Sequence, residues 1–134
     1  MDAADARDAL AAARIGRLAT VRANGSPHVV PCCFALVDDV VYSAVDAKPK
    51  RSRALQRLAN VEANPGASLV VDHYDDRDWT QLWWIRVDGT AHVLTDASTA
   101  LAALAAKYVQ YRSTPPPGPV LAIEITAWRW WSGG

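Results

Sequence analysis

The stretch that decides the fold is IGRLATVRANGSPHVVPCCFAL, residues 15–36. It holds two apolar, β-branched runs, 15–21 and 26–36, and the segment between them ends in Asn24-Gly25. An Asn-Gly pair between two such runs is a strong hairpin signal, because both residues tolerate the positive φ of a tight turn. Pro31 cannot donate to a ladder, so we expect its strand to lie at a sheet edge or to bulge. The sequence therefore predicts that the sheet begins with an antiparallel pair.

The rest of the chain is expected to alternate strands with short helices. Further strands are expected over residues 40–45, 67–73, 82–94 with a break at Asp88-Gly89, and 120–128. Helices are expected over residues 3–14, 52–59 and 97–108, the last with Thr95 or Asp96 as its N-cap. This pattern predicts a mainly β protein, a small closed or partly split β-barrel of six or so antiparallel strands, rather than a doubly wound sheet. A length of 134 residues fits a single domain, 1–134.

Composition narrows the class of protein. Lys and Arg total 14, as do Asp and Glu, so the net charge is zero, which argues against a dedicated nucleic-acid or membrane-surface protein. The first residues lack the apolar core of a signal peptide, and no run of ~20 apolar residues suggests a membrane span. We therefore expect a soluble, cytoplasmic protein. Cys32 and Cys33 are neighbours on an expected strand and would point to opposite faces, so no disulfide is expected between them.

Common cofactor and metal signatures are missing from the sequence. It contains neither Gly-x-Gly-x-x-Gly nor Gly-x-x-x-x-Gly-Lys, which removes the common dehydrogenases and ATPases. His28, His73 and His92 are not accompanied by ligand-spaced Cys, Asp or Glu. We expect no metal site and assign each histidine to a strand, with its hydrogen bonds satisfied. The catalytic residues stay unassigned.

A basic run stands where an expected strand passes into an expected helix. Its four cations are Lys48, Lys50, Arg51 and Arg53. A helix N-terminus offers unpaired amides and a partial positive charge, so added cations suit a phosphorylated ligand. The alternative is a solvated helix start. The preceding strand, with Ser43, can offer backbone groups to a planar ring, which together with the cations fits a flat aromatic cofactor with a phosphate tail.

Six tryptophans form two groups in the second half of the chain. Their ordinary role is in a core or a subunit interface, and the alternative is the wall of a pocket for an aromatic ligand. Arg86 shares its expected strand with Trp83 and Trp84, so that strand can supply both aromatic and cationic neighbours to such a ligand.

Four motifs carry a family resemblance. They are RLATV (17–21), GSPHVVP (25–31), VYSAVDAKPKR (41–51) and LANVEANP (58–65). The chain resembles the pyridoxamine 5′-phosphate oxidase-like split β-barrel superfamily over about residues 14–131. DHY (72–74) and LWWIR (82–86) are similar to the actinobacterial subgroup that uses the deazaflavin coenzyme F420.

The resemblance implies a homodimer with two cofactor sites at the subunit interface and a small-molecule substrate. It implies that the cofactor phosphate meets Lys50, Arg51, Arg53 and, more weakly, Lys48. The ring would lie beside Pro31, Ser43, Ala44 and Val45. Arg86 would reach the cofactor tail or the substrate, and Trp83 or Trp84 would wall the pocket across the dimer. The additional substrate-phosphate arginines and the longer C-terminal extension of the pyridoxamine phosphate oxidases are missing, so that activity is not expected.

The resemblance also implies an activity, hydride transfer from reduced F420 to an unsaturated acceptor. The spaced cations from Lys48 to Arg57 suit the anionic polyglutamate tail of F420, whereas FMN, the alternative cofactor, needs only one or two. Two other functions stay open: an FMN-dependent oxidase-related flavoprotein, and a non-catalytic module that binds a cofactor or tetrapyrrole. Single-stranded nucleic acid is disfavoured by the neutral total charge.

Overall fold

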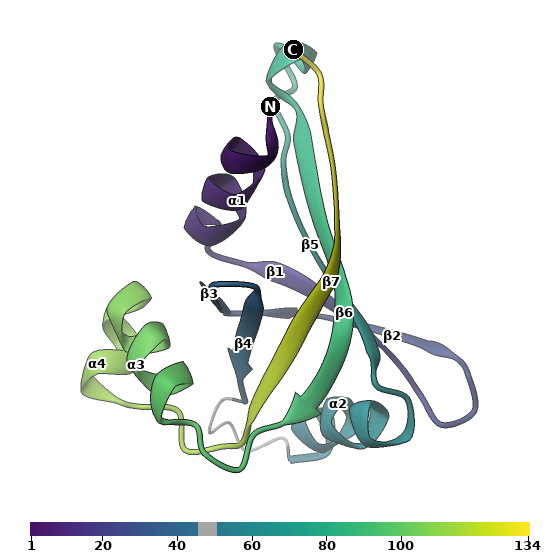
Figure 1. Cartoon of the computed structure of the whole chain (residues 1–134), viewed down its shortest axis with the longest axis vertical. Coiled ribbons are helices and arrows are strands. Elements are labelled where there is room, and N and C mark those ends of the chain that lie inside the picture. Colours follow the sequence, from purple (N-terminus) through teal and green to yellow (C-terminus); the bar gives the residue numbers. More distant parts are fainter. Residues whose placement is uncertain (46–50) are drawn as a thin grey trace.

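The computed structural model describes residues 1–45 and 51–134, and of residues 51–55 it describes only the backbone. The described residues form a seven-stranded antiparallel sheet in the order β2-β1-β5-β6-β7-β4-β3. The strands are β1 (Gly16–Val21), β2 (Pro27–Cys32), β3 (Ala35–Val37), β4 (Val40–Ala44), β5 (Gly66–His73), β6 (Trp83–Val93) and β7 (Val120–Ser132). The sheet curls into a split β-barrel, so the predicted fold class is confirmed (Figure 1).

Helices surround the sheet on several sides (Figure 1). They are α1 (Ala3–Ala12), α2 (Arg51–Ala63), α3 (Ser98–Lys107), α4 (Val109–Ser113) and the 3₁₀ turn η1 (Trp79–Gln81). The three predicted helices are present, α2 extends four residues beyond its predicted end, and α4 and η1 were not predicted. Asp96 accepts hydrogen bonds from the amide and hydroxyl of Ser98, although Ala97 is the N-cap of α3. Among the described residues, no helix is both long and apolar enough to cross a membrane.

The predicted hairpin is present. β1 and β2 pair antiparallel from Gly16 opposite Cys32 to Val21 opposite Pro27. Gly25 in the turn has a φ of 87°, a conformation that glycine adopts without steric cost. β2 lies at one edge of the sheet, so the edge position inferred from Pro31 is confirmed.

The single strand expected over 26–36 is instead two strands. β2 ends at Cys32 and β3 begins at Ala35, and these two strands are opposite edges of the sheet. Three residue steps span at most roughly 11 Å, so the two edges must come close together where Cys33 and Phe34 connect them. This crossing is what curls the sheet, and the apolar pattern alone did not reveal it because the run continues unbroken through both strands.

Side chains satisfy the backbone of this crossing. The Ser43 hydroxyl donates to the Cys33 carbonyl at 2.9 Å. The Phe34 amide donates to the Tyr108 hydroxyl at 3.1 Å, and the Phe34 carbonyl accepts from Lys107 Nζ at 2.9 Å. Lys107 Nζ also lies 3.9 Å from the centroid of the buried Phe34 ring. The junction after α3 therefore fastens the two barrel edges together.

α1 packs on the core through its apolar side. A capping box begins the helix: the Asp5 amide donates to the Asp2 carboxylate at 2.8 Å, and the Asp2 amide donates to Asp5 at 3.1 Å. Ala6 and Leu10 are fully buried in the main core cluster, together with residues of β1, β5, β6 and β7. The predicted apolar side of this helix at Leu10 is confirmed.

β6 runs through the predicted break. The register of β6 against β7 shifts between Asp88 and Gly89, which is a β-bulge rather than a strand end. β7 continues to Ser132, four residues beyond its predicted end, so that β5, β6 and β7 form a long ribbon beside α1 (Figure 1).

A substitution at Gly89 tests whether the bulge requires a glycine. A Cβ at this position would lie 2.1 Å from the Glu124 carbonyl oxygen, which belongs to the backbone of β7 and cannot move away cheaply. Gly89→Ala is therefore expected to lower the free energy of unfolding by about 1–3 kcal/mol, as overpacked positions do. Urea denaturation measures the change. The matched control is Gly66→Ala on β5, where nothing lies within 4 Å of the added Cβ. Equal stability of the two variants would contradict this account.

The Lys107–Tyr108 junction predicts a pH dependence of stability. Burial lowers the pKa of Lys107 from 10.5 to about 8, with a smaller effect of the Arg14 charge. The unfolded chain then binds more protons than the native protein between these values, so stability rises with pH from about 8 to 10.5. Burial raises the pKa of Tyr108 from 10.0 to about 12, so the native protein keeps a proton that the unfolded chain loses, and this stability falls above pH 10.

Denaturation between pH 7 and pH 11.5 measures both slopes. We expect Lys107→Met to flatten the rise and Tyr108→Phe to remove the fall. A wild-type stability that stays constant from pH 8 to pH 10 would contradict the first expectation.

Candidate functional site

The segment between β4 and α2 carries the predicted phosphate site. β4 ends at Ala44 and α2 begins at Arg51. Lys48 and Lys50 lie outside the described residues, and Arg51 and Arg53 are described by their backbone alone. The structure places both arginines in the first turn of α2, where amides are unpaired and the helix dipole is positive. This is the local setting that the sequence predicted for the cations.

The predicted ring-side residues gather where the barrel edges meet. Ser43 is buried on β4, and its hydroxyl donates a hydrogen bond to the Cys33 carbonyl. Cys33 comes two residues after Pro31, which is exposed. Val45 follows directly and donates its amide to the Pro119 carbonyl at 3.1 Å. The side chain of Ala44 belongs to the apolar cluster under α3, so only its main chain can meet a ligand.

One side of α2 brings a further cation to β2. Arg57 Nε and His28 Nδ1 are buried and have no hydrogen-bond partner among the described residues. Burial lowers the pKa of His28, and the charges of Arg22 and Arg57 lower it further, which favours the neutral imidazole. Burial raises the pKa of Cys32, against the opposing effects of the Ser43 hydroxyl and Arg57. Arg57 is therefore a cation with a free donor beside β2, which suits an anionic or carbonyl oxygen.

Two sequence expectations change here. His28 lies on a strand as expected, but its buried Nδ1 has no hydrogen-bond partner among the described residues, so the expectation of satisfied hydrogen bonds fails at that atom. Arg57 was counted only as a distant cation of the basic run. Its position one turn beyond Arg53 was the available signal that it shares the same end of the helix.

Trp83 and Arg86 do not lie beside Ser43 within one chain. Ser43 pairs with Leu121 on β7, whereas Trp83 pairs with Ser132. Eleven residues of strand correspond to about 35 Å. Trp83 and Arg86 also point to opposite faces, because their spacing on β6 is odd. Trp83 packs against the core with its ring centroid 6.1 Å from that of His73.

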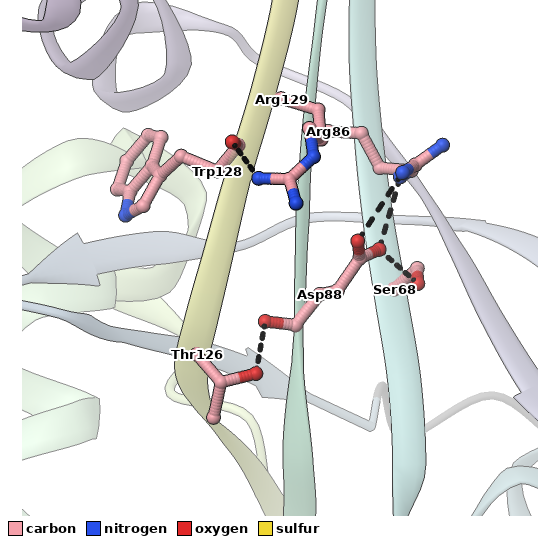
Figure 2. A network of polar contacts seen from close by, with 6 residues as sticks. All are labelled: Ser68, Arg86, Asp88, Thr126, Trp128 and Arg129. Atoms are coloured by element: carbon pink, nitrogen blue, oxygen red, sulfur yellow. Dashed lines mark hydrogen bonds and ion pairs between the residues drawn. The ribbon is translucent and has the colours of Figure 1, made fainter.

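Arg86 is held in a polar network on the outer face of the sheet (Figure 2). Its Nε and Nη2 donate to the two carboxylate oxygens of Asp88 at 3.0 and 3.3 Å, and the Ser68 hydroxyl donates to Asp88 at 2.6 Å. Burial of Asp88 favours the neutral acid, but the Ser68 and Arg86 hydrogen bonds and the charges of Arg86 and Arg129 outweigh it, so the pKa of Asp88 is lowered. The carboxylate stays charged and fixes the direction of Arg86.

The strand register aligns Arg86 with a row of residues across the same face. The row is Pro31, Arg17, Val70, Arg86 and Arg129, on β2, β1, β5, β6 and β7. It holds two of the predicted site residues, about 14 Å apart if three strand spacings separate them. The sequence analysis missed Arg17 and Arg129, because their alignment depends on a register that only the pairing of distant strands defines.

Tryptophans occur both in the core and on the surface. Trp83, Trp128 and Trp130 are partly buried against the main core. Trp79, Trp84 and Trp131 are exposed by 67, 36 and 47 %. Trp84 and Trp131 are cross-strand partners on the outer face that carries Arg86. The ordinary role of a tryptophan thus accounts for half of the set.

Comparisons with known proteins agree with this barrel. Residues 3–132 match the family model described as pyridoxamine 5′-phosphate oxidase. A 5a,11a-dehydrotetracycline/5a,11a-dehydrooxytetracycline reductase from Streptomyces rimosus is 33 % identical over 79 residues. That alignment covers 59 % of this chain and 54 % of the relative, so it spans about half the length of the reductase.

Solved structures share the fold at low sequence identity. A conserved hypothetical protein from Mycobacterium tuberculosis has a TM-score of 0.78 at 18 % identity, covering 99 % of this chain and 86 % of the other. An FAD-binding protein from Mesorhizobium loti has a TM-score of 0.71 at 24 % identity over 97 % of this chain and 94 % of the other. A haem-binding protein from Mycobacterium smegmatis has a TM-score of 0.74 at 20 % identity, over 97 % of this chain and 53 % of the other.

The family match extends over nearly the whole chain, and the curled sheet is a split β-barrel, as the resemblance in the sequence implies. The chain belongs to the pyridoxamine 5′-phosphate oxidase family.

Proposed function

We propose that the protein is an oxidoreductase that binds the deazaflavin coenzyme F420 and reduces an unsaturated small molecule. The observation that carries the proposal is the order of parts along the chain: the end of β4, with its buried Ser43, leads through two lysines into a helix that starts with Arg51 and Arg53. A helix start with several cations favours a phosphorylated cofactor over a neutral ligand.

The residues present fit such a cofactor. Lys48, Lys50, Arg51 and Arg53 would hold the phosphate, and Arg57 adds a buried Nε without a partner among the described residues. The main chain of Pro31 and of Ser43 to Val45 would lie beside the ring. When bound, reduced F420 supplies a hydride. The chain's own residues supply position and exclude water, and no proton donor is assigned.

The similar reductase from Streptomyces rimosus supports the substrate class. By its name it reduces 5a,11a-dehydrotetracycline, a compound with an unsaturated bond in a fused ring system. A conjugated acceptor of that kind can receive a hydride at one carbon and a proton at the other. We therefore propose a conjugated, ring-containing acceptor for this chain.

Two other cofactors are supported by specific likenesses. The FAD-binding protein from Mesorhizobium loti shares the barrel, which supports a flavin, FMN being the alternative that we propose for this site. The haem-binding protein from Mycobacterium smegmatis shares it too, which supports a non-catalytic tetrapyrrole-binding module. The spaced cations favour F420 over both, because its tail carries several negative charges.

We also propose that the protein is a homodimer through its outer sheet face. On the inner face Leu18, Leu69 and Ile85 are fully buried, whereas Val29 and Trp131 on the outer face are 61 and 47 % exposed. The outer face also carries acids and arginines side by side. A surface that has apolar area and both charges can be self-complementary in a two-fold dimer. The partner copy would then supply its Arg86 or Trp84 to a site that one chain leaves incomplete.

The cofactor assignment predicts the outcome of a titration. Purified protein is titrated with F420, FMN and haemin, and fluorescence or absorbance follows binding. We expect micromolar or tighter binding of F420 and weaker binding of the others. Preference for FMN would move the protein to the flavin enzymes, preference for haemin to the tetrapyrrole-binding module, and binding of none would overturn the proposed function.

The phosphate assignment predicts a loss of affinity in the double variant Lys50→Ala/Arg51→Ala. Charge-assisted hydrogen bonds contribute about 1.5–3 kcal/mol each, so the F420 affinity should fall by a few kcal/mol. Isothermal titration measures the change. The matched control is Arg77→Ala, which removes an exposed cation from the loop before η1. An unchanged dissociation constant in the double variant would rule out this phosphate site.

The dimer proposal predicts a change in mass with one substitution. Trp131→Glu places a charge in the outer face and should weaken dimerisation at least about tenfold, as expected for a buried aromatic anchor. Sedimentation velocity measures the change. The control is Val109→Glu on α4, which is 72 % exposed and lies away from the sheet face. A wild-type protein that sediments as a monomer would contradict the proposal.

A further inference from the structure

α2 is attached to the barrel by a line of side-chain amides. Gln56, Asn60 and Asn64 follow one another at intervals of four residues. Asn64 directly follows α2, and its amide still donates to the Asn60 carbonyl at 2.7 Å, so the three residues lie along one side of the helix. Gln56 Nε2 donates to Asn60 Oδ1 at 2.6 Å, and Asn60 Nδ2 donates to the Thr20 hydroxyl of β1 at 3.0 Å. Asn64 Nδ2 donates to the Arg22 carbonyl at 2.9 Å. We call these three residues the amide ladder.

The central contact of the ladder is fully enclosed. Asn60 is 1 % and Thr20 3 % exposed, and both are among the buried polar side chains of the described residues. If the Asn60 amide lost its partner, the full cost of removing it from water would remain uncompensated. The helix is therefore favoured in the one position that keeps this hydrogen bond. Apolar packing by Leu58 and Val61 on the same helix has no such directional requirement. The ladder therefore fixes the register of α2 against β1.

The positive charge of α2 makes neutral contacts such as the amide ladder useful for attaching it to the barrel. Its arginines are Arg51, Arg53 and Arg57, and its acid is Glu62. The Nε atom of Arg57 is buried near His28 and has no hydrogen-bond partner among the described residues. Repulsion among these cations opposes docking of this helix end, and neutral amides attach the helix without cancelling the positive charge. A net positive charge at this helix end suits an anionic ligand.

We propose that the amide ladder, through Asn60 and Thr20, positions the first turn of α2 and thereby sets where Arg51 and Arg53 meet the cofactor phosphate. This inference rests on the proposed function and adds positioning residues to it. Asn60 lies nine residues after Arg51, about 14 Å along a helix, so it acts on the phosphate through the rigid helix and not by contact.

The test uses ligands with and without the phosphate. Thr20→Val keeps the side-chain shape and removes the acceptor of Asn60, Thr20→Ser keeps the hydroxyl, and Thr126→Val removes a hydroxyl from β7 as a matched control. The ligands are F420 and its chromophore without the phosphate tail, with FMN and riboflavin as a second pair. Dissociation constants are measured by fluorescence titration.

We expect Thr20→Val to weaken F420 binding roughly 5–20-fold, in the range of coupled contacts, and to change binding of the bare chromophore less than about twofold. Thr20→Ser and Thr126→Val should resemble the wild type. In an Arg51→Ala background, Thr20→Val should cost less than about twofold, because the group that it positions is gone.

The outcomes separate this inference from the proposed function. Equal losses for both members of a ligand pair would show a merely structural role and overturn the positioning inference, while the proposed function would stand. Equal losses in the wild-type and Arg51→Ala backgrounds would overturn it as well. If the wild-type protein binds neither F420 nor FMN, the proposed function fails and the inference fails with it.

Discussion

The constraint on which the structure depends is the two-residue crossing between β2 and β3. Seven antiparallel strands would normally leave two edges exposed, yet here Cys33 and Phe34 join those edges directly. The sheet must curl to allow this, and the backbone groups of the crossing find side-chain partners in Ser43, Lys107 and Tyr108. The same contacts close the barrel, satisfy these polar groups and attach the end of α3, which lies in the connection between β6 and β7.

The crossing also explains where the candidate site forms. It brings the residue after β2 next to β4, where the Ser43 hydroxyl donates to the Cys33 carbonyl, although the two strands belong to opposite halves of the sheet order. The chain then leaves β4 towards α2, whose side faces the same hairpin through Asn60 and Thr20. A ligand bound at this place would contact backbone from two barrel edges and cations from one helix. In the homodimer that we propose, the outer face of the long ribbon of a second subunit would complete this region.

Local signals predicted much of this protein, and nonlocal geometry accounts for what they missed. The Asn-Gly turn and the apolar runs identified the hairpin, and the edge position of Pro31 followed from its missing amide. The break at Cys33 could not be predicted, since the run remains apolar on both sides and the change of partner strand leaves no trace in composition. The bulge at Gly89 was predicted as a strand break, because a glycine inside a strand pattern is typical of a bulge as well as of a strand end. For the site, the cations at the start of α2 were predicted from their context, whereas the row through Arg17, Arg86 and Arg129 depends on register.

The neutral total charge of the chain hides a strong local division. In the sequence, residues 48–57 hold five cations and no acid. On the outer face, Arg17 and Arg86 each pair with an aspartate, at 3.3 and 3.0 Å. Paired arginines hold their direction but offer little net field, as surface ion pairs do. Several cations close together in the sequence at a helix start offer a net positive field but repel one another, and neutral contacts can hold such a helix in place. The amide ladder provides such contacts, and this difference is why we propose a subunit interface for one arginine group and an anionic ligand for the other.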